Sequence, residues 1–402
     1  MTDSHTTKRV KLTDVLDVSQ VTQAYSTDIC CVLNPKKPRC MPMPGFDETF
    51  VDIVDFILRI TYWIWHEKKV DLCRDYYSTE CAIHTMAGDI QGAEAVVKNT
   101  WQTLEAFPDR TLDGENVVWS VENEYDKSGE KVVYYSSHLI VSRMTNLGES
   151  EFGPPTGVRA RIRTVADCVC TENKVVEEWL MRDNHLLVTT LGFKPEEVAL
   201  KQAKKDLSEG GTNLLVFLEP ERERVRQQAI DMSITVPPAK PTDDPAALAR
   251  ALFCTLWQKQ EHDKIGSFYD FRVTAHLTAG RELYGTVELS EYLRDFQSGL
   301  TDIRIAVDHV ACVPFLNIHT GAVDAAIRWT LVAEHSGDSK VLGGASGASV
   351  YILGSSHFRI IEGRVREEWT VFDELALLRQ VATKRLLSPQ ESPNRARSVA
   401  GS

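Results

Sequence analysis

The sequence predicts an α+β fold that occurs twice in tandem. In each half, segments with helical periodicity come first and long strand-like segments follow, an order typical of α+β domains rather than of alternating α/β domains. Characteristic residues of the first half recur about 190 positions later. A proline-rich stretch, VPPAKPTDDP, lies between the halves and has the composition of a linker. We therefore expect two copies of one unit, each of roughly 140 residues.

Composition excludes several classes of function. The chain has 402 residues, 43% of them hydrophobic and 25% charged, and its formal net charge is −12. General nucleic-acid binders are basic, so DNA and RNA are poor candidate partners. The most hydrophobic run, residues 50–65, contains three charged residues and is shorter than the ~20 residues of a membrane span. The first residues lack the apolar core of a signal peptide. We expect a cytoplasmic protein with no membrane partner.

The cysteines and the short motifs predict no cofactor. The nine cysteines include no CxxC pair, and neither Cys30-Cys31 nor Cys168-x-Cys170 matches a zinc site. We interpret them as reduced thiols. The sequence has no GxGxxG after a strand, no Walker loop, no GxSxG and no HExxH. Nucleotide, flavin and metal chemistry are therefore not expected.

The first half begins after an extension over residues 1–46, which ends in the proline-rich KKPRCMPMPGF. The first domain is predicted over residues 47–194. Helical spacing covers residues 47–77, and a second helix is expected after Gly92. Four segments rich in Val, Tyr, Ile and Thr then predict strands, ENVVWSVENEYD, KVVYYSSHLIVSRMTN, VRARIRTVADCVC and KVVEEWLMRD.

A helical and proline-rich connector is predicted over residues 195–244, and the pattern then restarts. The second domain, over residues 245–384, opens with the helix PAALARALFCTLWQKQ and continues with strands. The polar residues 385–402 are expected to be disordered.

The internal repeat is in register at rare residues. Some pairs are 192 positions apart, and later pairs are 190 apart; among them are Trp65 and Trp257, Tyr77 and Tyr269, His84 and His276, Gly157 and Gly347, Trp179 and Trp369, and Asp183 and Asp373. In the second register Asp167 falls on His357. A position that keeps a titratable group while changing its type indicates a role beyond packing.

These motifs resemble the SnoaL-like polyketide cyclase family, within the nuclear transport factor two-like superfamily. The resemblance covers about residues 50–193 and 246–384. It is carried by Trp65-His66-Glu67 before VDLCRDYY, His84-x-x-x-Gly88, FGPPTG, the strand with Asp167, NKVVEEWLMRD, and their counterparts in the second copy. It implies two cone-shaped domains, each a curved antiparallel sheet wrapped around N-terminal helices with an apolar pocket between. Relatives with one copy pair through the outer faces of their sheets. A tandem chain could make that pairing internally, and a further homodimer is possible.

Asp167 is the first candidate catalytic residue, because in family cyclases an Asp on the matching strand is the acid/base. It shares a strand face with Val165 and Val169, and desolvation there would raise its pKa toward neutrality. The alternative is an exposed face, or an ion pair with an arginine such as Arg143. A family His often precedes the PPTG turn; the first copy has Gly-Glu-Ser-Glu there.

Histidines are the other candidate catalytic groups, since imidazole can move protons near pH 7. His335 occupies the position before the turn in the second copy, and His357 replaces the Asp. The resemblance places His84 and His276 at the pocket mouths. The alternative for these two is the capping of a turn.

Six further residues are candidates for substrate binding. Tyr135, or His84, could hold a developing oxyanion, and the tryptophans could line a pocket or pack in a core. The set is Trp65, Tyr135, Arg143, Trp179, Trp257 and Trp369.

The predicted function is cofactor-independent acid/base catalysis, of cyclase, isomerase, dehydratase or lyase type, on a small, partly apolar carbonyl or hydroxyl compound. One alternative is a non-catalytic small-molecule-binding or scaffolding protein with two relic pockets. Another is an epoxide-hydrolase-like site that uses Asp167, Arg143 and a second carboxylate. A closed apolar cavity around Asp167 would favour catalysis, and a pocket filled by side chains would favour binding or structure.

Overall fold

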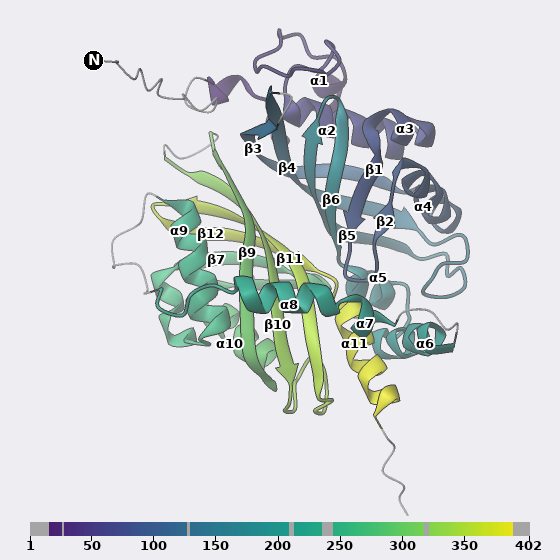
Figure 1. Ribbon diagram of the computed structural model, residues 1–402, viewed down its shortest axis with the longest axis vertical. Coiled ribbons are helices and arrows are strands. Elements are labelled where there is room, and N and C mark those ends of the chain that lie inside the picture. The colour runs from purple at the N-terminus through teal and green to yellow at the C-terminus, as the bar shows by residue number, and fades with distance from the viewer. Residues whose placement is uncertain are drawn as a thin grey trace, which may run out of the picture.

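The computed structural model describes residues 16–25, 28–126, 129–208, 213–234, 244–316 and 321–388. Figure 1 shows two domains side by side, each with a curved sheet and helices on one face. Most of the predicted proline-rich linker and residues 389–402 of the predicted tail lie outside the described residues. In the described part of the chain, no helix is long and apolar enough to cross a membrane.

The first domain contains four short helices and a six-stranded sheet. The helices are α2 (Ile53–Trp65), η3 (Val70–Leu72), α3 (Cys73–Tyr76) and α4 (Ala93–Ala106). The strands are β1 (Tyr77–His84), β2 (Ile90–Gln91), β3 (Thr111–Asp126), β4 (Gly129–Thr145), β5 (Arg159–Thr171) and β6 (Lys174–Arg182). Their order is β2-β1-β6-β5-β4-β3. The predicted α+β cone is confirmed with one correction: β1 and β6 pair in parallel, so the sheet is mixed rather than antiparallel.

The second domain repeats this order as β8-β7-β12-β11-β10-β9, again with a single parallel pair among its described strands, β7 with β12. Its helical elements are α9 (Pro245–Leu252), η4 (Phe253–Gln258), η5 (His262–Ser267), η6 (Thr278–Gly280), α10 (Gly285–Gln297) and α11 (Glu374–Leu387). Its strands are β7 (Tyr269–Leu277), β8 (Arg281–Tyr284), β9 (Leu300–Pro314), β10 (Val323–His335), β11 (Ala348–Ile361) and β12 (Arg364–Phe372).

The connector consists of α5 (Asn184–Thr190), α6 (Pro195–Ser208), α7 (Leu214–Phe217) and α8 (Glu219–Gln228), and α8 lies across strands of the second sheet (Figure 1). The N-terminal extension contains η2 (Val18–Gln20) and α1 (Ile29–Leu33).

The N-terminal extension covers one side of α2. The carboxylate of Asp52 caps this helix by accepting from the Asp55 amide, and it also accepts from Thr22 and pairs with Lys37. Asp55 in turn pairs with Arg59 one turn later. The three charged residues of the hydrophobic run 50–65 are therefore buried, and they are neutralised by one another and by the extension.

The outer faces of the two sheets pack against each other. Asp167 Oδ2 accepts a hydrogen bond from Arg328 Nη1 at 3.0 Å, and the Arg328 guanidinium lies 3.3 Å from the centroid of the Trp179 ring. Elsewhere in the interface, Ser137 hydrogen-bonds His357 Nε2 at 2.9 Å. Both sheets thus have two buried faces, one toward their own helices and one toward the other domain.

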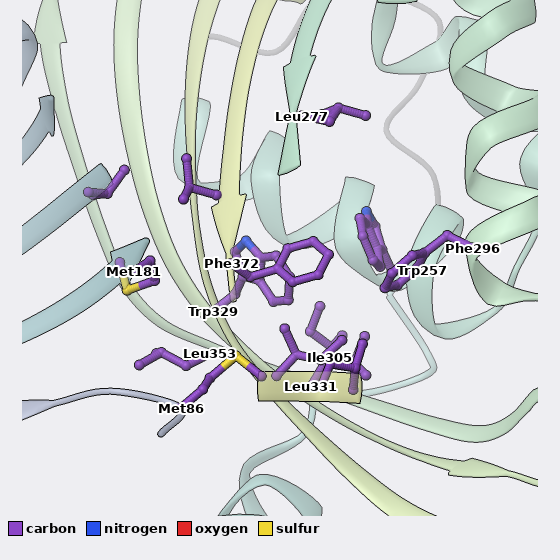
Figure 2. Close-up of a cluster of buried hydrophobic side chains, with 14 of the residues drawn as sticks. Met86, Met181, Trp257, Leu277, Phe296, Ile305, Trp329, Leu331, Leu353 and Phe372 are labelled. Atoms are coloured by element: carbon purple, nitrogen blue, oxygen red, sulfur yellow. The ribbon is translucent and has the colours of Figure 1, made fainter. Parts of the chain in front are cut away.

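Aromatic side chains fill the interior of the second cone. The buried rings come from its helices and from strands β10, β11 and β12, and they are Phe253, Trp257, Phe296, Trp329, Phe358 and Phe372. Figure 2 shows Trp329 beside Phe372, with Trp257 next to Phe296. Trp329 lies directly over Gly354, where an added Cβ would come within 2.3 Å of the indole. The glycine therefore makes room for the ring.

Arg328→Ala tests the sheet–sheet interface. Removal of one partner leaves the buried Asp167 carboxylate uncompensated, so we expect a loss of about 3–5 kcal/mol in the free energy of unfolding. Urea denaturation of the full chain measures it. Arg143→Ala is the control, because its pair with Asp113 is exposed and contributes about 0–1 kcal/mol. Equal effects of the two substitutions would contradict the assigned role of the pair.

Gly354→Ala tests the packing of the second cone. The added methyl group collides with the Trp329 ring, and overpacking of this kind costs about 1–3 kcal/mol. The thermal unfolding midpoint should fall accordingly. Gly266→Ala is the matched control, since nothing lies within 4 Å of a Cβ at that position. A stable Gly354→Ala protein would mean that the tryptophan has room to move.

Candidate active site

The first cone contains a cavity of about 80 Å³ between its helices and the inner face of its sheet. The helices contribute mainly aliphatic side chains, among them Ile57, Ile60 and Ile64 of α2 and Val96 of α4. Trp65 and Asn99 are partly exposed and lie among the lining residues. The cavity is therefore largely apolar. A polar group that points into it loses its hydration, which costs free energy.

Three neighbouring strands, β4, β5 and β6, contribute polar groups to the cavity. Side chains alternate between the two faces of a strand, so every second residue points inward. These residues are His138 and Ile140 on β4, Thr164, Ala166 and Cys168 on β5, and Glu178, Leu180 and Arg182 on β6. Because His138 pairs with Ala166 and Glu178 pairs with Cys168, the imidazole and the carboxyl flank the same strand.

Glu178 is the carboxyl group of the cavity. It is 4% exposed, and Oε2 has no hydrogen-bond partner among the described residues. Burial raises the pKa of Glu178 to about 7, although the charge of Arg182 and the Tyr77 hydroxyl lower it in part. This carboxyl can therefore exist in both protonation states near neutral pH.

His138 is the imidazole of the cavity. It is 1% exposed, and burial lowers its pKa to about 3, so the ring is neutral at physiological pH. Nε2 has no partner among the described residues. The ring fits because position 114 is a glycine: a Cβ there would lie 2.8 Å from Nε2.

Two arginines complete the charged groups. Arg110 is 5% exposed, donates from Nε to Ser142 at 2.9 Å and lies over the Trp65 ring at 4.9 Å. Burial, together with the charge of Arg182, lowers the pKa of Arg110 to about 9. Arg182 Nε is buried without a partner among the described residues. A titrating carboxyl, a neutral imidazole and two guanidinium groups in an apolar cavity can transfer a proton and stabilise an oxyanion.

Asp167 does not line this cavity, which corrects its expected position on the pocket wall, while its role as the acid/base stays a prediction. It does share a face with Val165 and Val169, but that face meets the second domain, and Ala166 and Cys168 point into the cone. Its carboxylate pairs with Arg328 and is 2% exposed. The sequence could not reveal this, because both faces of the sheet are apolar.

The predicted histidines lie in four separate places. His357 is in the sheet–sheet interface, where burial lowers its pKa to about 3. His335 is buried at the end of β10 and hydrogen-bonds Ser346 at 2.9 Å. His84 hydrogen-bonds Glu177 at 3.1 Å, and His276 hydrogen-bonds Glu282. None of these four lines the cavity of the first cone.

Of the six predicted binding residues, Trp65 alone lines the first cavity. Trp257 packs in the second core, and the Trp369 ring stacks on His276. The other three are outward-facing. Tyr135 stacks on His309 in the interface, Arg143 pairs with Asp113 at the surface, and Trp179 lies between Arg328 and His84.

The candidate residues selected from the sequence did not include Glu178, His138, Arg110 or Arg182. A single signal was available. Glu178 and Glu368 match in the repeat, each within a shared Glu-Glu-Trp sequence. Glu177 and Glu178 point to opposite faces of the sheet because side chains alternate along a strand. The sequence alone does not show which of these faces meets the helices.

The second cone has lost the corresponding groups. Strand pairing aligns Asp167–Trp179 with His357–Trp369. In this alignment the cavity residues His138, Ile140, Thr164, Cys168 and Arg182 correspond to Ile327, Trp329, Gly354, Phe358 and Phe372. Glu368 remains, but Tyr269 and Thr370 both donate to it. Among the described residues, no group of three His, Cys, Asp or Glu side chains could hold a metal in either domain.

Comparisons with solved structures find chains that each match about a third of this chain. A SnoaL-like polyketide cyclase from Agrobacterium tumefaciens is 19% identical, with 34% of this chain and 96% of that chain covered and a TM-score of 0.27. IdmH from Streptomyces antibioticus is 22% identical, with 35% and 97% covered and a TM-score of 0.27. TsrD from Streptomyces laurentii is 18% identical, with 35% and 98% covered and a TM-score of 0.29. A search of curated proteins finds no match.

The family assignment rests on the sequence itself. The profile of the family described as SnoaL-like polyketide cyclase matches residues 56–191 and again residues 247–381, which together make up about two thirds of the chain. The two matches coincide with the two cones. The chain therefore belongs to the SnoaL-like polyketide cyclase family and carries two tandem copies of its domain.

Proposed function

We propose that the first cone catalyses cofactor-independent acid/base chemistry, of cyclase or isomerase type, on a small, partly apolar carbonyl compound. The observation that carries this proposal is Glu178, a buried carboxyl with a pKa of about 7 and a free oxygen in an apolar cavity. A general base is most effective when its pKa lies near the working pH. Family membership is consistent with this chemistry.

In the proposed reaction, the Glu178 carboxylate removes a proton from the carbon beside the substrate carbonyl. The electron pair of the broken C–H bond moves into the carbonyl, and the resulting enolate oxygen is stabilised by Arg110 or Arg182. The nucleophilic carbon then attacks a second carbonyl in a ring closure, or takes a proton back at another position. Protonated Glu178 returns the proton, so the carboxyl ends in its starting state.

His138 serves to orient the substrate. Because its pKa is about 3, it stays neutral and can hydrogen-bond a substrate oxygen without adding charge. The aliphatic walls from α2 exclude water, which strengthens the interaction between the arginines and a developing oxyanion. The size of the cavity restricts the site to a small substrate or to the reacting end of a longer one.

The second domain has a different role in this proposal. Its interior is occupied by Trp329 and Phe372, which favours a structural or scaffolding function for this copy. It covers the outer face of the strands that carry Glu178 and His138.

A cytoplasmic location is supported by the nine free cysteines. A further homodimer stays a prediction.

Glu178→Gln should change how stability depends on pH. The folded state holds a proton up to about pH 7, whereas the unfolded carboxyl releases it near 4.5, so wild-type stability falls as pH rises between these values. Relative to wild type, the free energy of unfolding of the variant should increase by on the order of 3 kcal/mol as the pH rises from 4.5 to 7.5. Urea denaturation across this range measures the gain. Glu80→Gln, an exposed change in the same sheet, should show no gain. A flat difference for Glu178→Gln would contradict the raised pKa.

Glu178→Gln should also slow proton transfer. The assay measures deuterium incorporation beside the carbonyl of small ketones, such as acetone and butanone, by mass spectrometry in D₂O. Loss of a general base should slow exchange on the order of 10²-fold or more, while Glu80→Gln keeps the wild-type rate. The wild-type rate should rise with pH through about 7, following the deprotonation of Glu178.

Asp167→Asn distinguishes the proposed base from the residue favoured by family resemblance. If Asp167 acts through the interface alone, the folded fraction of this variant should retain exchange. Loss of exchange in a folded Asp167→Asn protein, with full activity in Glu178→Gln, would overturn the assignment.

A further inference from the structure

A second cavity lies between the two domains. Its volume is about 620 Å³, against about 80 Å³ for the first cone. Its walls come from the outward side of β1 and β6, from connector helices α7 and α8, and from the outer face of β9, β10 and β11. Ligand sites in proteins often lie at such domain interfaces. The duplication and the connector create this cavity, and it is separate from the proposed catalytic site.

The cavity presents a buried guanidinium group. Arg328 is 7% exposed and lies among the lining residues. In the described part of the chain, Asp167 is the one acceptor for its N–H groups, through Nη1, and Nε is buried without a partner. A guanidinium has five N–H donors, so most of those of Arg328 are unused. Unused donors in a buried position favour a ligand that offers an acceptor oxygen.

The charges around the cavity disfavour an anion. The lining carboxylates are Asp89, Glu177, Glu221 and Asp308, and the lining cations are His84, Arg224 and Arg328. Hydrogen bonds that the His84 ring donates to the carboxylates of Asp89 and Glu177 raise the pKa of His84 to about 9, so it counts as a cation. Asp167 adds a further negative charge beneath Arg328. Negative groups therefore outnumber positive ones, and an uncharged acceptor suits the site better than a carboxylate.

The remaining wall is apolar. Connector and second-domain strands contribute most of it, with Phe217, Leu218, Val307, Tyr351 and Leu353. Trp179 offers little free ring surface, because Arg328 lies over it and His84 is 5.3 Å away. The apolar body of a ligand would therefore lie against the connector and the second sheet.

We propose that this interdomain cavity, which we call the cleft, is a binding site for a neutral, partly apolar molecule whose carbonyl oxygen accepts hydrogen bonds from Arg328. The guanidinium of Arg328 would bind the carbonyl oxygen, and the apolar wall would contact the rest of the ligand. This site does not depend on the proposed chemistry of the first cone.

Calorimetric titration of the full chain with three naphthalene probes tests the site. The probes share one ring system and differ in charge: 2-acetonaphthone is neutral, 2-naphthoate is an anion and 2-(aminomethyl)naphthalene is a cation. We expect the ketone to bind at least tenfold more tightly than either charged probe. Ketone binding that is absent at millimolar concentration, or no tighter than that of a charged probe, would overturn the proposal.

Matched variants locate the bound ketone. Val307→Trp places a large ring in the cleft, and it should weaken ketone binding at least tenfold. Gln228→Trp, at an exposed position on α8, places a large ring at the rim of the cleft and should also weaken ketone binding. It replaces Val307→Trp if that variant does not fold. Ala166→Leu narrows the first cone and should leave this binding unchanged. Binding that survives both cleft variants, or that is lost in Ala166→Leu, would place the ketone elsewhere and refute the cleft site.

Discussion

The structure depends on the burial of two sheet faces against each other within one chain. A sheet normally buries one face and exposes the other. Here the second domain covers the outer face of the first, and the buried pair between Asp167 and Arg328 lies in this contact. A buried pair contributes little net stability, but it is costly to break, so it favours one alignment of the two sheets. The Arg328 guanidinium also lies over the ring of Trp179, the residue that follows Glu178 on strand β6. This contact helps to hold β6 in place.

The two copies share a backbone and differ in what they enclose. In the first, Ile140 faces Thr164 across two paired strands, and space remains beside them. In the second, Trp329 faces Gly354, and the indole takes that space. A tryptophan can lie there only because its partner lacks a side chain. Together with Phe358 and Phe372 at the positions of Cys168 and Arg182, this pair separates a cone with a packed core from a cone with a cavity.

Desolvation acts on the first cavity in a consistent way. It disfavours charge, so it raises the pKa of Glu178 and lowers the pKa of His138 and Arg110. The carboxyl therefore titrates near neutrality while the imidazole stays neutral. The interior of the second copy retains Glu368, but two hydroxyl groups satisfy it, so the same residue type there stabilises a core instead of facing open space.

The sequence by itself determined the fold class, the duplication and the family, because periodicity, rare residues in register and ordered motifs survive without coordinates. It did not determine which face of each strand meets the helices. Alternation reveals a sheet's inner face only when the outer face is polar, and here both are apolar because the second domain covers one of them. Tertiary structure therefore decided that Asp167 belongs to the interface and Glu178 to the cavity, although both lie on predicted strands. It also decided that the cleft exists, since its walls come from segments far apart in the chain.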